Sequence, residues 1–150
     1  MKAIVAALIG LTALSSAPEQ PRSPYDADLA KKLGADEYGM KVYALVLLKS
    51  GPRQDLSKAE SDQAFAGHMA NINRLADTRD LVFAGPLQKN DRYRGIFVFN
   101  VKTQAEAEAL VATDPAVIAG ALAGDVYMLY GSAALQEVTD IHRRISFKQP

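Results

Sequence analysis

Residues 40–48 read MKVYALVLL, and the architecture of the chain can be worked out from this stretch. Valine, leucine and tyrosine dominate it and Gly51-Pro52 follows soon after, which is the pattern of a β-strand that ends at a turn. Successive side chains of a strand point to opposite faces of its sheet. Val42, Ala44, Val46 and Leu48 therefore share one face, and Tyr43, Leu45 and Leu47 share the other. Both faces of this strand are apolar, so both faces of its sheet need a cover.

A long amphipathic helix is predicted next, over residues 57–78. Ser57 followed by Glu60 predicts a capping box, in which each side chain satisfies a free backbone amide of the other residue. Apolar side chains then repeat at helical spacing. They are Phe65, Met69, Ile72, Leu75 and Ala76. This face is expected to pack on the sheet.

Three further strands and a second helix complete the predicted core. The strands are expected over residues 81–84, 95–101 and 126–130, where β-branched and aromatic side chains gather. Thr103 and Glu106 predict a second capping box, and the helix that it opens runs to about residue 113, followed by a short helical turn within 116–122. The order β-α-β-β-α-β predicts an α+β fold of ferredoxin-like topology, with a four-stranded antiparallel sheet and both helices on one face.

The third and fourth predicted strands are also apolar on both faces. The helices cover only one face, and monomers rarely leave a large apolar patch exposed. A second copy of the chain would cover the other face, which predicts a homodimer through the sheet faces and a dimeric α+β barrel. The alternative cover is the C-terminal segment folded back over the sheet. That segment is short and carries four basic or titratable side chains, His142, Arg143, Arg144 and Lys148.

The N-terminus has the three-part pattern of a secretory signal peptide over residues 1–17. Lys2 precedes an apolar run over 3–14, and the small residues of 15–17 follow. The alternative is a buried N-terminal helix, which the prolines that follow at 18, 21 and 24 disfavour. The remaining predicted parts are an N-terminal arm over 18–38 with a short helix over 26–33, a domain over 39–131 and a C-terminal tail over 132–150. An exported protein, periplasmic or secreted, is expected, with no membrane anchor after cleavage.

The composition excludes several classes of function. Lys and Arg together number 17 and so do Asp and Glu, which argues against a nucleic-acid partner because phosphate binding needs a basic surface. The absence of cysteine excludes disulfides and thiolate chemistry. No Walker loop, GxGxxG or GxSxG motif occurs. One histidine with scattered carboxylates is a poor metal site, so neither a metal nor a cofactor is predicted.

His68 and Asp114 are the candidate catalytic residues. His68 falls on or beside the apolar face of the long helix, where it is either a core-edge histidine or a general base or acid. Asp114 precedes Pro115, so it is either a helix cap or the carboxylate that orients the histidine ring. The second reading requires hydrogen-bond contact between the two side chains. The other histidine, His142, is interpreted as a surface residue.

Two other sets of side chains have open interpretations. Arg92 and Arg94 follow the second strand and would either meet an anionic ligand or form a solvated hairpin tip. Five aromatic residues would either line an apolar pocket or belong to the core and the dimer interface. They are Tyr43, Phe97, Phe99, Tyr127 and Tyr130.

Residues 42–131 resemble a YCII-related domain. The resemblance rests on a first strand followed by Gly51, His68 within the first long helix, Gly85-Pro86 after the second strand, and Asp114-Pro115 after the second helix. It implies a ferredoxin-like domain that dimerises sheet to sheet, with a His-Asp active site that falls on His68 and Asp114. The chain departs from typical members in its signal peptide, arm and tail.

Two functions follow as hypotheses. In the first, His68 and Asp114 catalyse isomerisation or elimination of a small cyclic or aromatic molecule held between the helices and the sheet, without a cofactor. In the second, the protein is a non-catalytic periplasmic ligand-binding or assembly module, and the pair holds the helices together.

Overall fold

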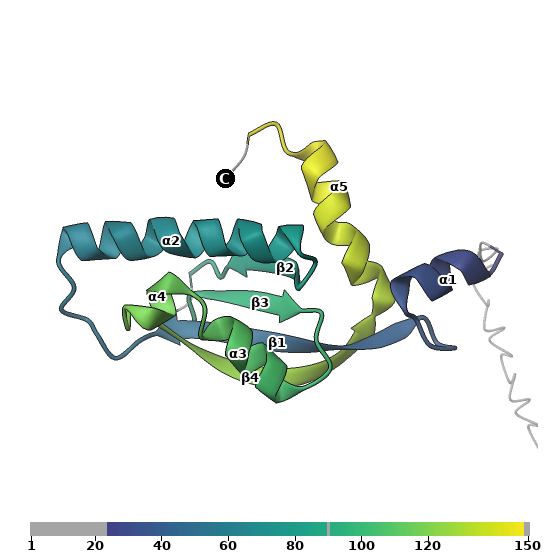
Figure 1. Ribbon diagram of the computed structural model, residues 1–150, viewed down its shortest axis with the longest axis horizontal. Coiled ribbons are helices and arrows are strands. Elements are labelled where there is room, and N and C mark those ends of the chain that lie inside the picture. Colours follow the sequence, from purple (N-terminus) through teal and green to yellow (C-terminus); the bar gives the residue numbers. More distant parts are fainter. Residues whose placement is uncertain (1–23, 90, 149–150) are drawn as a thin grey trace, which may run out of the picture.

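The computed structural model describes residues 24–89 and 91–148 and contains a single four-stranded antiparallel sheet (Figure 1). The strands are β1 (Met40–Ser50), β2 (Leu81–Pro86), β3 (Gly95–Phe99) and β4 (Leu122–Ser132). The helices are α1 (Ala27–Leu33), α2 (Lys58–Asp77), α3 (Gln104–Val111), α4 (Pro115–Ile118), the 3-10 helix η1 (Ala133–Glu137) and α5 (Val138–Ile145). The sheet order β2-β3-β1-β4 is that of a ferredoxin-like fold, which confirms the predicted fold class. The predicted signal peptide over 1–17 lies outside the described residues.

The fourth strand is longer than predicted because β1 pairs with it along its whole length. The pairing runs from Met40 opposite Ser132 to Ser50 opposite Leu122. Gly124 lies near the start of this strand, and a glycine there weakens the strand pattern of the sequence. A Cβ atom there would lie 2.8 Å from Val46 Cγ1, so glycine is needed for the close packing of the two strands. The third strand ends at Phe99, two residues earlier than predicted.

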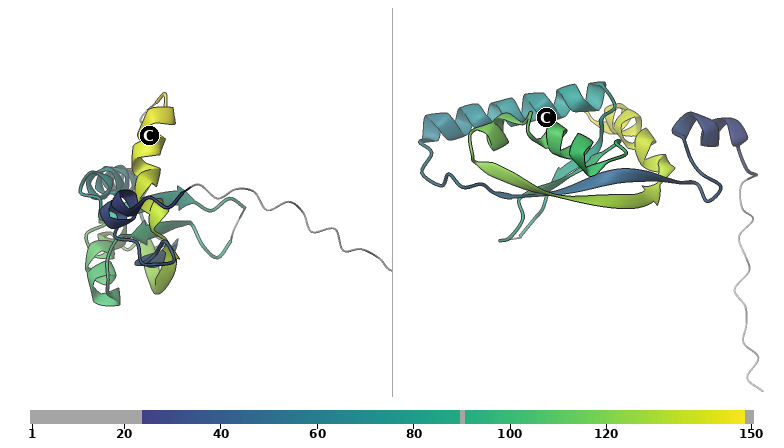
Figure 2. Two further views of the ribbon diagram at one scale, coloured as in Figure 1. Left: turned by 90° about the vertical axis from the view of Figure 1, so that its right-hand side faces the viewer. Right: turned by 60° about the horizontal axis from the view of Figure 1, so that its bottom comes forward.

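Helices α2, α3 and α4 lie on one side of the sheet (Figure 2). Both predicted capping boxes form, at the start of α2 and of α3. The buried stripe of α2 is different from the predicted one: it consists of Ala64, His68, Asn71 and Leu75, and Phe65 is 64% exposed. A stripe with a histidine and an asparagine at its centre cannot be found by counting apolar residues. It packs on a core beneath it that includes Val46, Phe97 and Phe99.

The C-terminal segment covers part of the second face of the sheet. Residues 133–150, whose structure the sequence left open between helix and strand, form η1 and α5 as far as they are described. Leu135 packs against a second core cluster of Tyr43, Val82 and Val98. The Tyr43 hydroxyl donates to the backbone oxygens of Ser132 and Ala133, at 3.1 and 3.2 Å. The predicted alternative cover therefore exists at this end of the sheet.

Another part of the second face stays open. We call Leu45, Leu47, Phe83, Ile96 and Tyr127 the open sheet patch. Phe83 is 40% exposed and Tyr127 is 52% exposed, while the three aliphatic residues are half-buried. None of the helices in the described ranges is long and apolar enough to cross a membrane.

Candidate active site

His68 and Asp114 are in direct contact, although 46 positions separate them in the chain. His68 Nδ1 lies 2.7 Å from Asp114 Oδ2, and the residues are 8% and 0% exposed. A carboxylate only accepts hydrogen bonds, so Nδ1 carries a proton, and in the neutral ring Nε2 then holds the free lone pair. The contact that the catalytic interpretation required is present.

Asp114 reaches His68 because it also caps a helix. Its extended backbone stands at the start of α4, and its Oδ1 accepts a hydrogen bond of 2.9 Å from the Ala116 amide. Pro115 takes the first helical position, where its missing amide costs nothing. The two oxygens of one carboxylate thus serve two partners, since Oδ1 caps α4 and Oδ2 holds the histidine ring. The capping and orienting interpretations are both compatible with this geometry.

Gly67 allows α4 to approach α2 closely enough for this contact. A Cβ atom at position 67 would lie 2.7 Å from Pro115 Cβ and 2.9 Å from Pro115 Cγ, and both distances are too short for non-bonded carbon atoms. Gly67 and Pro115 are the direct chain neighbours of His68 and Asp114. In the sequence, Gly67 indicates only a slight weakening of the helix, and nothing there indicates its contact with Pro115.

The His68 ring stacks with two phenylalanines. Its centroid lies 6.0 Å from that of Phe65, with 30° between the ring planes, and 5.7 Å from that of Phe97, with 27° between the ring planes. These contacts and the Asp114 carboxylate determine the orientation of the imidazole. The sole buried side-chain nitrogen or oxygen without a hydrogen bond in the described ranges is Asn71 Nδ2. No described group hydrogen-bonds to His68 Nε2, and His68 is one of the residues that line a cavity.

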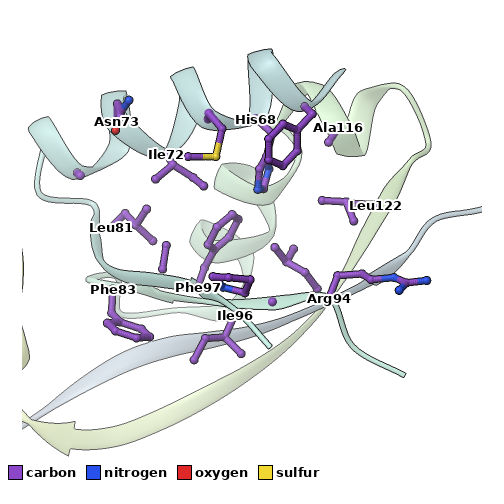
Figure 3. Close-up of a pocket in the computed structure, with 18 of the residues that line it drawn as sticks. His68, Ile72, Asn73, Leu81, Phe83, Arg94, Ile96, Phe97, Ala116 and Leu122 are labelled. Carbon is purple, nitrogen blue, oxygen red and sulfur yellow. The ribbon is translucent and has the colours of Figure 1, made fainter. Parts of the chain in front are cut away.

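His68 lines a cavity of about 1,200 Å³ between α2 and the sheet. Figure 3 shows His68 reaching toward Phe97, with Arg94 and Leu122 at one end of the cavity and Phe83 at the other. Phe83 and Ile96 point away from α2, on the other side of the sheet from His68, and both are nevertheless among the residues that line the cavity. The wall is mostly apolar. An accessible imidazole nitrogen in such a wall can exchange a proton with a bound molecule.

Other candidate residues are distributed around this cavity. His142, interpreted from sequence as a surface residue, is exposed but lines the cavity from α5. Of the five aromatic residues considered for a pocket, only Phe97 lines it; Tyr43 and Phe99 are core residues, and Tyr127 and Tyr130 are half-exposed. Within residues 24–89 and 91–148, no three His, Cys, Asp or Glu side chains come together as a potential metal site.

Comparison with known proteins identifies a family. The family model of the YCII-related domain matches residues 43–129, which is more than half of the 150-residue chain. The chain is also similar to 5-chloro-2-hydroxyhydroquinone dehydrochlorinase from Burkholderia phenoliruptrix AC1100, solved in complex with 2,5-dihydroxybenzoquinone. That structure has 18% sequence identity and a TM-score of 0.40, over 58% of this chain and 91% of the other. A similarity this distant supports no argument about activity. No curated protein matches the chain.

Proposed function

The chain belongs to the YCII-related family, and from that premise we propose that it is a small-molecule enzyme in which His68 is the general base or acid. The observation that carries the proposal is the buried 2.7 Å contact between His68 Nδ1 and Asp114 Oδ2. It assigns the proton to Nδ1 and leaves the lone pair of Nε2 at the wall of an apolar cavity. A histidine base that is oriented in this way by a neighbouring carboxylate is a usual arrangement in acid-base catalysis.

The proposed reaction is a proton transfer on a small cyclic or aromatic molecule. Nε2 removes a proton from a ring carbon beside a carbonyl, and the electron pair of the broken C–H bond moves into the ring to form an enolate. In an isomerisation, the imidazolium returns the proton to a different carbon. In an elimination, the electron pair forms a new double bond and the leaving group departs with its own bonding pair. Neither route requires a cofactor.

Hydrogen exchange tests this function without knowledge of the natural substrate. The full chain is incubated in D2O with a panel of small cyclic ketones, and deuterium incorporation is followed by mass spectrometry. The wild type is expected to catalyse exchange, and His68→Gln is expected to lower the rate at least about 100-fold with unchanged folding, because general base catalysis is typically worth roughly 10²–10⁴. Asp114→Asn is expected to lower it too, since an amide does not hold Nδ1 in the protonated form.

The non-catalytic alternative has one observation in its favour, which is that Asp114 also caps α4. If the pair only holds α2 and α4 together, His68→Gln lowers the melting temperature, and neither the wild type nor the variant exchanges deuterium. A binding or assembly module then becomes the better proposal.

The proposed enzyme is a homodimer, and the open sheet patch supports this state. The patch contains two large half-exposed aromatic side chains, Phe83 and Tyr127, beside three aliphatic ones. η1 packs only at the Tyr43 end, so a second sheet is the expected cover for the rest. Leu47→Lys places a charge in the patch and is expected to convert a dimer to a monomer in analytical ultracentrifugation. A wild type that is already monomeric contradicts this part of the proposal.

The proposed site of action is outside the cytoplasm, because residues 1–17 have the pattern of a signal peptide. Expression of the full chain in a Gram-negative host, followed by fractionation and intact-mass measurement, tests this. A periplasmic product that lacks the first residues is expected. A full-length product that stays in the cytoplasm refutes it.

A further inference from the structure

Arg94 stands at the same cavity as His68, and its position is well defined. Its backbone amide donates to the Leu48 oxygen at 2.7 Å, and its own carbonyl accepts from the Leu87 amide at 2.9 Å. The side chain is anchored as well, because Nε and Nη2 donate to the Ser50 hydroxyl oxygen at 3.0 and 2.9 Å. The guanidinium is therefore held in place before any ligand binds.

The anchored guanidinium keeps most of its binding capacity. Arginine has five N–H donors, and Ser50 takes two of them. The three that remain include one pair on Nη1 and Nη2, which is the fork that matches the two oxygens of a carboxylate. In the part of the chain that the structure describes, no carboxylate lies within ion-pair distance of Arg94, whereas Arg53, Arg79 and Arg143 each have at least one.

The charges of the cavity wall leave Arg94 uncompensated. Apart from the histidines, the other charged residues of the wall within the described ranges are Asp77 and Arg143, and these two form an ion pair with each other. Asp114 is fully buried behind the His68 ring and does not reach the wall. Among the described residues, the wall therefore carries one positive charge without an ion-pair partner, on the exposed side chain of Arg94 at one end of the cavity, which favours a negatively charged ligand there.

Phe65 gives the cavity a flat apolar surface near His68. Its ring is 64% exposed although it is stacked on His68, so it is not a core residue. Phe97 also stacks with this imidazole but is buried, so only Phe65 offers an open ring face. An exposed aromatic face favours planar partners, which stack on it with an offset.

From these features we propose that the substrate is a planar ring compound with a carboxylate group, that Arg94 binds this carboxylate, and that the exposed ring of Phe65 holds the substrate ring beside His68. The inference rests on the proposed function, because it places the reacting ring carbon at His68 Nε2. Arg94 is then the residue that selects for the anion, and His68 is the residue that reacts.

A pair of isosteric probes tests the anion. Benzoate and benzamide have nearly the same shape and differ in charge. Binding to the full chain is followed by the NMR signals of the His68 ring, which are assigned by comparison with His142→Gln. Benzoate is expected to shift these signals and to bind at least about tenfold more tightly than benzamide, because hydrogen bonds to a charged group are roughly twice as strong as neutral ones. Arg94→Gln is expected to remove this difference, with benzamide affinity unchanged.

Arg92→Gln is the matched control, because it removes the same charge from the same connector at a residue that does not line the cavity. It is expected to bind benzoate as the wild type does. The inference is overturned if benzoate leaves the His68 signals in place, if benzamide binds as tightly as benzoate, or if Arg94→Gln keeps the preference for benzoate.

The deuterium-exchange assay separates this inference from the proposed function. If Arg94→Gln binds benzoate normally while His68→Gln abolishes exchange, the anion site is wrong and the acid-base role stands. If Arg94 controls benzoate binding while His68→Gln exchanges deuterium normally, the anion site stands and the acid-base role is wrong.

Discussion

Replacement of Gly67 by alanine tests the packing that joins His68 to Asp114. The new Cβ atom would lie 2.7 Å from Pro115 Cβ, and ordinary contact begins near 3.4 Å. Both atoms belong to short, stiff groups, so α4 has to move away from α2 by roughly 0.7 Å to reach that contact. Asp114 directly precedes Pro115 and moves with it. The Nδ1–Oδ2 distance of 2.7 Å then approaches about 3.4 Å, beyond a normal hydrogen bond.

The expected free-energy change combines two opposing effects. Overpacking of a tight contact costs about 1–3 kcal/mol. Alanine in place of glycine inside a helix contributes about 1 kcal/mol in the other direction. The net expectation is a free energy of unfolding that is unchanged or lower by up to about 2 kcal/mol, instead of the increase of about 1 kcal/mol that an open helical site would give.

Urea unfolding measures the stability, and the downfield proton NMR signal of His68 Nδ1–H reports the hydrogen bond. Ala66→Gly is the matched control, because position 66 is the exposed neighbour in the same helix and isolates the propensity effect at about 1 kcal/mol. Gly67→Ala is expected to weaken or abolish the Nδ1–H signal, while Ala66→Gly leaves it intact. The reasoning is refuted if Gly67→Ala stabilises the protein by about 1 kcal/mol and retains the signal.

Three further predictions concern stability. Ser57→Ala removes the hydroxyl that accepts from the Glu60 amide and is expected to lower the free energy of unfolding by about 1 kcal/mol in urea titrations; no change would mean that α2 begins without this cap. Tyr43→Phe leaves two backbone oxygens without their donor and is expected to cost about 1–2 kcal/mol in the same assay, whereas an unchanged midpoint would argue against η1 docking on the second face. The Tyr130 hydroxyl, followed by two backbone amides, holds the pKa of Asp36 below its ordinary value. A carboxyl group whose pKa is lowered on folding stabilises the fold at pH values above its unfolded-state pKa, and this stabilisation is lost as the pH falls through its folded-state pKa. Asp36→Asn is therefore expected to flatten the pH dependence of the free energy of unfolding in the acid range. An equally steep profile in both proteins would contradict this.

For the candidate site, the spacing of residues along the chain identified the two residues but not the distance between them. His68 and Asp114 were each recognised as candidates, and each retained a structural interpretation because spacing does not give a distance across the fold. The structure places Nδ1 and Oδ2 at 2.7 Å and shows Asp114 capping α4 at the same time. Their catalytic role remains a prediction. The close contact of Gly67 with Pro115, which makes the pair possible, has no signature in either local sequence.

The local sequence alone determined the order of helices and strands as far as residue 132, both capping boxes and the two-faced apolar strands, because these depend on residues a few positions apart. Only the tertiary structure decided which side chains of α2 face the core, how much of β4 pairs with β1, and that part of the second sheet face is covered by the protein's own C-terminal segment. The position of α5 in the fold likewise decides that His142 lines the cavity. The physical reason is that burial and close packing depend on the neighbour that arrives from a distant part of the chain, whereas helix caps and strand patterns are properties of a short segment.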